Sequence, residues 1–354
     1  MPSPRLANLQ ILRFAAAALV AHAHGVDLAQ KVGAPPRLLA AGALENFGAI
    51  GVDIFFVISG LIITRTAFQS GPVAAGTFAW NRLWRVAPIY YLLSLPWLLA
   101  AAVAGRLSGP MLAASLAFWP AAGARMTLPA LDVGWTLCFE MLFYLAVATI
   151  LAAGRGRAWA VAAALAAFAA CWVARVHTGL AMFQFLGNPI ILEFLMGVAA
   201  ALLAPRMTRR AGWMALGLGA FGLGFGLWLG NGAISEAPAI LSGQASALRV
   251  LVWGAPSALL TLGIVALEPA TRPSPVRRAL AWMGDASYAL YLVHPLVISL
   301  MGLLLLSAPW ATSGDLIVVG AFLTSLAAGA ATHLWLEQPL QRWRTRSGLS
   351  AAKT

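Results

Sequence analysis

Residues 46–67 read NFGAIGVDIFFVISGLIITRTA, and this stretch decides the fold class because Asp53 and Arg65 are its only charged residues. A run of about 20 apolar residues is long enough to cross the ~30 Å hydrocarbon core of a bilayer as a helix. Lipid cannot hydrogen-bond an exposed backbone, so a spanning segment is a helix or a strand of a closed barrel. The apolar residues here are continuous and do not alternate with polar ones, which favours a helix.

Similar runs recur along the whole chain of 354 residues, of which 61% are hydrophobic and only 10% charged. Soluble domains carry about 25% charged residues, so most of this surface does not face water. The sequence therefore predicts an all-α polytopic transmembrane bundle. We expect about ten spans, at 8–26, 46–67, 86–104, 132–153, 158–176, 185–204, 211–230, 246–267, 284–306 and 316–336.

A further apolar run at 111–120 is too short to cross, and Gly109-Pro110 and Pro120 enclose it. We expect this segment to be re-entrant or interfacial. Counting it as a span would move the basic loop at 155–157, and every later basic loop, to the outer side. The positive-inside rule therefore favours ten spans with both termini in the cytoplasm. We expect one membrane domain over 1–345 and a cytoplasmic tail over 346–354.

The net charge of +12 comes from basic residues in short loops between the spans, without an aromatic-interleaved basic stripe. Topology explains this charge better than nucleic acid as a partner. The two cysteines lie in apolar segments and form neither a disulfide framework nor a metal site, so we expect no metal.

The first span holds Arg13, His22 and His24. At about 100° per residue, Arg13 and His24 return to one helix face, roughly 16 Å apart along the axis, whereas His22 points to the opposite side. An Arg within a span normally faces the bundle interior or water because burial in lipid is costly. The alternative is that Arg13 extends to the headgroups and His24 lies at the outer interface.

Asp53 in the second span is predicted at a depth similar to that of His24 if the two helices are antiparallel. A carboxylate there can orient an imidazole or accept its proton. The alternative is an acid at a helix start, stabilised by the helix dipole. Ser59 and Gly60 are predicted to form a helix contact of small residues, with no role in chemistry.

Arg82 and Arg85 precede the third span at i and i+3, so they can share one helix face. Two planar guanidinium groups are suited to bidentate binding of phosphate. The alternative is that they are positive-inside residues beside an aromatic belt.

Glu140 lies inside the fourth span, within the segment from Trp135 to Tyr144. A carboxylate in hydrocarbon must be paired or protonated. The candidate partners are Arg13, Arg125 and His24.

His294 lies in the middle of the ninth span, and Pro295 frees a backbone carbonyl nearby. At the end of the last span, His333 and Glu337 form an i, i+4 pair suited to a local structural contact.

Together these motifs resemble, in the same order, those of the membrane-bound acyltransferase family 3, the O-acyltransferases of bacterial surface polysaccharides. The resemblance covers nearly the whole chain. The matching blocks are Arg13-x10-His24, Gly51 to Gly60, Arg82-x-x-Arg85, Trp135-x4-Glu140-x2-Phe143-Tyr144, Ser287-Tyr288-x-Leu290-Tyr291-Leu292-x-His294 and Glu337-x-Pro339. Their agreement favours the functional interpretations of the basic residues over the structural ones.

The resemblance implies transfer of an acyl group, acetyl first of all, from cytoplasmic acyl-CoA to a hydroxyl of a cell-surface glycan or glycolipid. His24 would be the general base or a transiently acylated nucleophile, and Asp53 would orient it. Arg82 and Arg85 would bind CoA phosphates, and Arg13 would contact the donor or pair with Glu140.

Tyr144, His294 and Glu337, with Glu140, are further candidate site residues. The resemblance also implies the inner membrane of a bacterium as the location.

Two features depart from the family pattern. His22 adds a second imidazole near His24, and the extracytoplasmic hydrolase-like domain of some members is missing. Acceptor recognition would then fall to the membrane bundle, to a homo-oligomer or to a partner protein. The rival function is a transporter or exporter of a polar or lipid-linked metabolite, which would explain intramembrane charges as a substrate or proton path. A scaffold without catalysis would leave those charges unexplained.

Overall fold

The computed structural model describes residues 6–39, 47–69, 71, 73–229, 234–269, 273–307 and 313–346, and these ranges contain helices but no β-strand. Among the described residues, ten helical runs are long and apolar enough to cross a membrane, which confirms the predicted ten-span bundle. Their main helices are α1 (Ala7–Lys31), α2 (Ile50–Thr64), α3 (Ala75–Val103), α5 (Trp135–Ala152), α6 (Arg157–Thr178), α8 (Ile191–Leu203), α9 (Arg209–Trp228), α12 (Ala255–Ala266), α14 (Ser287–Ser307) and α15 (Gly314–Thr332).

Shorter elements connect or extend these spans. They are α4 (Gly109–Leu116), α7 (Ala181–Leu186), α10 (Ala237–Leu241), α11 (Ser246–Arg249), α13 (Pro275–Asp285) and α16 (Gln338–Arg346), the π-helical turns η2 (Arg65–Gln69), η7 (Val250–Gly254) and η8 (His333–Glu337), and the 3-10 turns η3 (Asp132–Gly134), η4 (Gly154–Gly156) and η5 (Ala204–Arg206).

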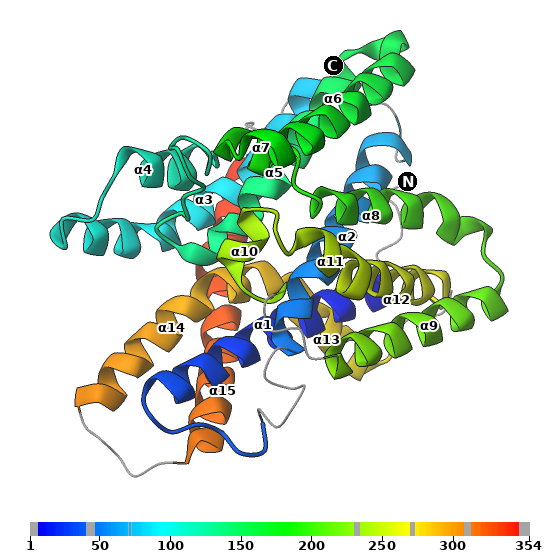
Figure 1. Cartoon of the computed structure of the whole chain (residues 1–354). Coiled ribbons are helices and arrows are strands. Elements are labelled where there is room, and N and C mark those ends of the chain that lie inside the picture. The colour runs from blue at the N-terminus through cyan, green and yellow to red at the C-terminus, as the bar shows by residue number, and fades with distance from the viewer. Residues whose placement is uncertain are drawn as a thin grey trace.

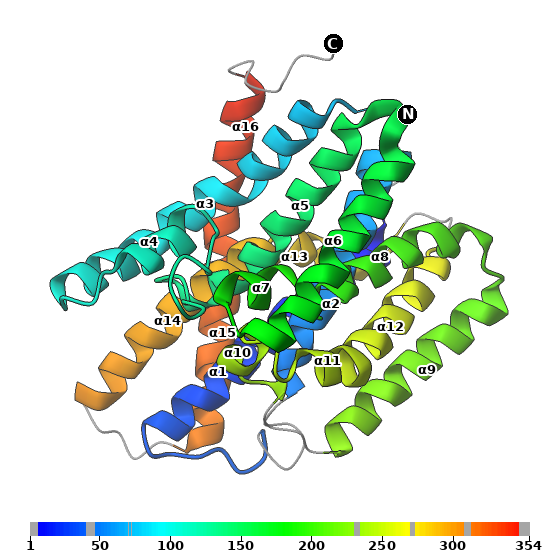
Figure 2. The same cartoon turned by 45° about the horizontal axis from the view of Figure 1, so that its top comes forward.

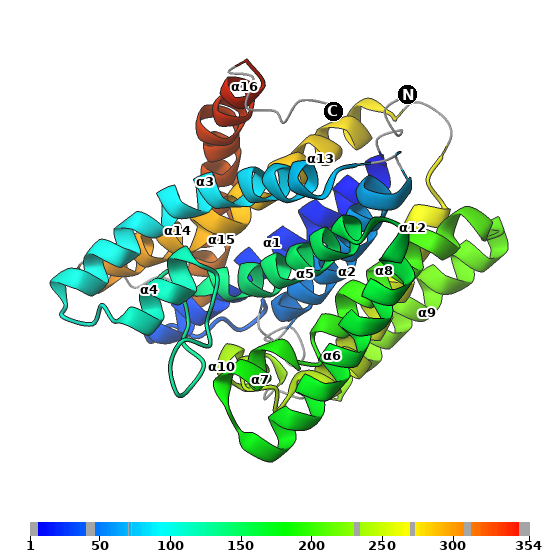
Figure 3. The same ribbon diagram turned by 90° about the horizontal axis from the view of Figure 1, so that it is seen from above.

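The centre of the bundle is the pair α1 and α2 (Figures 1 and 3). On one side α1 packs against α14 and α15, and on the other α2 packs against α8 and α12. In the most apolar part of the α2 run 72% of the residues are buried, whereas α6 has no buried residue and lies at the periphery. Asp53, the charged residue of α2, is therefore enclosed by other helices, not by lipid.

Close packing of α2 on α8 depends on small residues, as predicted for Gly60. A Cβ atom at Gly60 would collide with the backbone oxygen of Phe194, and one at Gly197 would collide with that of Val57. Without side chains at these two positions the backbones approach closely, which is how helices associate in membranes. This contact fixes the face of α2 that carries Ser59.

Two spans extend beyond their predicted ends. The third was expected to begin at residue 86, but α3 begins at Ala75 and has 29 residues, a length of about 44 Å. Hydropathy marks only the lipid-facing part, whereas the helix continues through Arg82 and Arg85 into the polar zone. The last span likewise continues through η8 into α16, which ends at Arg346. The rest of the expected tail, 347–354, lies outside the described residues.

The apolar run after α3 does not cross, in agreement with the sequence. Its helix, α4, has eight residues and lies beside α3 (Figure 2). Tyr91 in the middle of α3 donates a hydrogen bond to the Leu116 carbonyl at 2.6 Å. The segment after α3 thus folds back onto the span it follows.

Candidate active site

Two cavities lie between the helices of the bundle, and each has its own set of polar side chains. The arginine cavity, about 150 Å³, is lined by Arg13, Arg82, Arg85, Glu140, Tyr144 and Tyr288, among others. The histidine cavity, about 470 Å³, is lined by His24, Asp27, Asp132, Trp135, Glu236 and Arg249, among others. Val52 and Tyr291 line both cavities, so the two spaces meet at these residues.

Helix α1 joins the two cavities. Arg13 lines the arginine cavity and His24 lines the histidine cavity. His22 is not among the described residues around either space. The structure therefore places His24, and not His22, on the cavity side of α1, because His24 and Arg13 both point inward. This is the orientation that helical spacing predicts.

The ring of His24 has a defined orientation. Its Nδ1 lies 3.0 Å from the Val20 carbonyl oxygen, one turn earlier in α1. A carbonyl oxygen only accepts hydrogen bonds, so Nδ1 carries the proton and donates it. The lone pair is then on Nε2, the nitrogen that a general base or a nucleophile needs.

His294 of α14 is the neighbour of His24. The two ring centroids are 4.9 Å apart in an edge-to-face arrangement. His294 is fully buried, and its Nδ1 lies 3.2 Å from the Leu290 carbonyl oxygen, so this ring has the same tautomer. The structure thus brings together two candidates that are separated by most of the chain.

The prediction that Asp53 contacts His24 is wrong. Asp53 is 0% exposed, and both of its oxygens accept hydrogen bonds from Arg249, from Nε at 2.9 Å and from Nη2 at 2.7 Å. Gly51 marks the side of α2 that meets α1, since a Cβ there would collide with Ala16. Asp53, two residues later in the helix, points to the opposite side, where it meets Arg249 of α11. The Val20 carbonyl provides the orientation of His24 that we had expected from Asp53.

Sequence reasoning missed Arg249 and Glu193. Arg249 is 1% exposed, and Glu193 of α8 is 0% exposed. Glu193 lies close to Asp53 and Arg249, but neither of its carboxylate oxygens has a hydrogen-bond partner in the described part of the chain. Both residues lie inside predicted spans, and the criterion that singled out Glu140, a charge within an apolar run, would have found them.

The expected basic partners of Glu140 are not among its described hydrogen bonds. Its Oε1 instead accepts hydrogen bonds from Ser59 Oγ at 2.6 Å and from the Tyr144 hydroxyl one turn along α5. Two neutral donors satisfy this carboxylate, because the packing of α2 on α5 brings Ser59 opposite it. Ser59, to which we had assigned no chemistry, is part of the polar lining.

Arg82 and Arg85 face the arginine cavity from α3, as their i, i+3 spacing predicts. Arg82 donates to Thr66 Oγ1 at 2.7 Å. Arg85 forms a salt bridge of 2.8 Å with Glu337, and its side chain remains 36% exposed. Both guanidinium groups are therefore oriented by neighbouring helices but not enclosed by them.

Glu337 joins the end of the last span to α3. Besides its salt bridge with Arg85, it lies 2.7 Å from His333 Nδ1 in η8, which confirms the local i, i+4 contact predicted for this pair. π-Helical turns are often found at functional sites. Here the turn places a carboxylate beside the arginine cavity.

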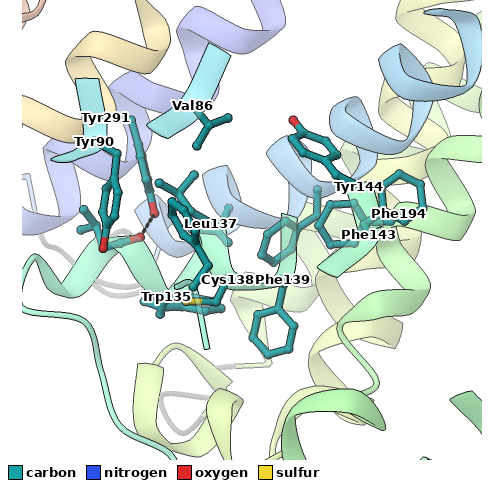
Figure 4. Close-up of a cluster of buried hydrophobic side chains, with 14 of the residues drawn as sticks. Val86, Tyr90, Trp135, Leu137, Cys138, Phe139, Phe143, Tyr144, Phe194 and Tyr291 are labelled. Atoms are coloured by element: carbon teal, nitrogen blue, oxygen red, sulfur yellow. Dashed lines mark hydrogen bonds between the residues drawn. The ribbon is translucent and has the colours of Figure 1, made fainter. Parts of the chain in front are cut away.

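Tyr291 marks the boundary between the two cavities. Its hydroxyl lies 2.9 Å from Thr136 Oγ1 and 2.9 Å from the Val133 carbonyl oxygen. Tyr291 belongs to the cluster of buried side chains drawn in Figure 4. Its ring packs edge-on against Phe55, with centroids 5.9 Å apart. These contacts hold the ring between α5 and α14.

The described part of the chain contains no group of three or more His, Cys, Asp or Glu side chains that could hold a metal ion.

Comparison with known proteins agrees with the site. The family model described as an acyltransferase domain, that of acyltransferase family 3, matches residues 6–334. The exopolysaccharide production protein ExoZ of Rhizobium meliloti (strain 1021) is 31% identical over 316 residues, which are 84% of this chain and 90% of that protein. No solved structure matches the chain. The match favours an acyltransferase over the transporter that the sequence left as an alternative. The chain therefore belongs to acyltransferase family 3 and is an integral membrane acyltransferase.

Proposed function

We propose that the protein transfers an acyl group, with acetyl as the first candidate, from acyl-CoA to a hydroxyl of an exopolysaccharide or of its lipid-linked precursor. The observation that carries this proposal is the pair of cavities that meet at Tyr291, one with three arginines and one with the imidazole of His24. The name of the Rhizobium relative, an exopolysaccharide production protein, supports the acceptor class.

The distribution of basic loops supports an orientation with both termini in the cytoplasm of a bacterial inner membrane. In this orientation the arginine cavity opens to the cytoplasm, where acyl-CoA is made. The histidine cavity then lies in the outer half of the membrane, on the side where surface polysaccharide is assembled. The acyl group would pass between the two cavities at Val52 and Tyr291.

In the arginine cavity, Arg82 and Arg85 would bind phosphate oxygens of the donor, for which their planar forks are suited. Arg85 would exchange part of its contact with Glu337, which keeps its hydrogen bond to His333. The hydroxyls of Ser59 and Tyr144 and the carboxylate of Glu140 would pair with the amide groups of the pantetheine arm. Arg13 would add positive charge at the same wall.

In the histidine cavity, Nε2 of His24 would accept the proton of the acceptor hydroxyl. The acceptor oxygen then bonds to the acyl carbon while the carbon–sulfur bond of the thioester breaks. The proton passes from Nε2 to the sulfur, which leaves as the thiol, so no net proton is consumed. A positioned general base of this kind contributes about 10²–10⁴-fold in rate. The same lone pair would act as the nucleophile if an acyl-imidazole forms.

The test compares His24→Ala with His22→Ala in membranes supplied with labelled acetyl-CoA and isolated surface polysaccharide. We expect His24→Ala to lower transfer by about 10²–10⁴-fold, whereas His22→Ala keeps most of the activity because that ring lies outside both cavities. Full activity of His24→Ala would refute its role. If wild-type membranes transfer no label from acetyl-CoA, the donor assignment is wrong.

A further inference from the structure

The arginine cavity is too small for a whole acyl-CoA molecule. Its volume is about 150 Å³, whereas sites that enclose drug-sized ligands measure about 300–1,000 Å³. The present inference rests on the proposed function. If that function is correct, the cavity holds only the acyl and pantetheine end of acyl-CoA. The nucleotide end must then bind outside, next to Arg82 and Arg85.

Helix α16 lies at this place. Arg344 donates a hydrogen bond to Asn81 Oδ1, on the residue before Arg82. The ring of Trp343 stacks on that of Trp84, with centroids 5.8 Å apart and planes inclined by 24°. These contacts hold α16 against the start of α3 (Figure 2). The salt bridge of Arg85 with Glu337, the residue directly before α16, supports the same packing.

The side chains that α16 presents here are one aromatic ring and one cation. Trp343 is 53% exposed although it stacks on Trp84, so part of its ring surface remains accessible. Arg344 is held beside α3 by its hydrogen bond to Asn81, and with the two arginines of α3 it makes the neighbourhood strongly positive. Glu337 forms a salt bridge with Arg85 at this place.

We infer that the start of α3 and helix α16 form a binding subsite for the nucleotide end of CoA. This end is a purine nucleotide, adenosine, with a phosphate on the 3′ oxygen and a diphosphate on the 5′ oxygen of its ribose. The ring of Trp343 stacks on the base, a contact that every purine can make. Arg344 pairs with the 3′-phosphate, because guanidinium groups bind phosphate by charge-assisted hydrogen bonds. Arg82 and Arg85 then face the diphosphate at the entrance of the cavity.

Tryptophan and arginine at the end of a span also fit an anchor for lipid headgroups. The two readings differ in what they predict for a donor without a nucleotide. A nucleotide subsite strengthens the binding of acetyl-CoA but not that of S-acetyl-pantetheine, which has the same acyl end and no nucleotide. A lipid anchor affects stability in the membrane and leaves the preference between the two donors unchanged.

The experiment measures the Kd of acetyl-CoA and of S-acetyl-pantetheine for the purified full chain, by calorimetry in nanodiscs of neutral phosphatidylcholine. The variants are Trp343→Ala and Arg344→Gln. The control is Arg209→Gln with Arg210→Gln, two basic residues at the start of α9, on the far side of the bundle from α3 (Figure 3). Thermal unfolding without ligand shows whether each variant is folded.

We expect each α16 variant to weaken binding of acetyl-CoA by about 10-fold and to leave S-acetyl-pantetheine unchanged, while the α9 control changes neither. If the variants keep the wild-type preference for acetyl-CoA, the subsite does not exist, and α16 is a lipid anchor if their stability falls. If the wild type binds neither donor, the donor assignment itself fails. A wild type that binds both donors equally would refute the subsite and leave the assignment of an acyl thioester donor intact.

Discussion

Arg249 and the pair Arg82 and Arg85 are all arginines at helix contacts, yet their surroundings are opposite. Arg249 belongs to the wall of the histidine cavity but is only 1% exposed, and it donates to both oxygens of Asp53 and to the carbonyl oxygens of Ile234 and Ala49. Arg82 and Arg85 line a cavity, and Arg85 is 36% exposed beside a single carboxylate.

The difference separates an arginine suited to a structural role from arginines suited to binding a ligand. A buried guanidinium group with its donors satisfied joins chain segments and has little capacity for a ligand, because a ligand would have to displace those partners. A guanidinium group that is oriented but partly exposed can take on a phosphate at small cost. Asp53, which the sequence placed in the catalytic group, belongs to the first class.

Removing one partner of the buried pair is expected to give the largest effect on stability. Asp53→Ala would leave Arg249 buried without its carboxylate and lower the free energy of unfolding by about 3–5 kcal/mol. Denaturant or thermal unfolding in detergent measures this. The double variant Asp53→Leu with Arg249→Met should regain most of the loss. Wild-type stability of Asp53→Ala, combined with loss of transfer, would restore the catalytic role.

Changing the exposed pair should affect donor binding instead. Arg82→Gln with Arg85→Gln removes hydrogen bonds of charged groups, worth about 1.5–3 kcal/mol each, so KM for acetyl-CoA should rise at least 10-fold. Stability should fall less than in Asp53→Ala, because His333 still bonds Glu337, the buried carboxylate that loses Arg85. Initial rates over a range of donor concentrations, beside an unfolding curve, test this. Arg155→Gln with Arg157→Gln, in an exposed turn, is the matched control. An unchanged KM would remove the phosphate role.

The smallest effect is expected at the boundary of the two cavities. Tyr291→Phe keeps the ring but removes its hydroxyl contacts with Thr136 and Val133, a loss of about 1 kcal/mol in stability. Tyr288→Phe, which loses a hydroxyl contact with the Val86 carbonyl, is the matched variant. Unfolding and transfer per folded protein are measured for both. A loss of transfer as large as that of His24→Ala would make Tyr291 a catalytic residue.

The parts of the site that follow from one helix could be predicted from the sequence. The shared orientation of Arg13 and His24, the common face of Arg82 and Arg85, and the contact of His333 with Glu337 depend only on helical spacing. The partners of Asp53 and Glu140 could not, because they come from other helices. Asp53 meets a residue 196 positions away, and Glu140 one 81 positions away.

The sequence by itself determined that the chain spans the membrane about ten times and that several of its spans carry charged residues. The first conclusion follows from the cost of polar groups in hydrocarbon, which acts on each segment separately. Only the tertiary structure decided which charges pair and which remain open to a cavity. That choice depends on the rotation and depth at which helices pack, and small residues such as Gly60 and Gly197 set these at contacts far apart in the sequence.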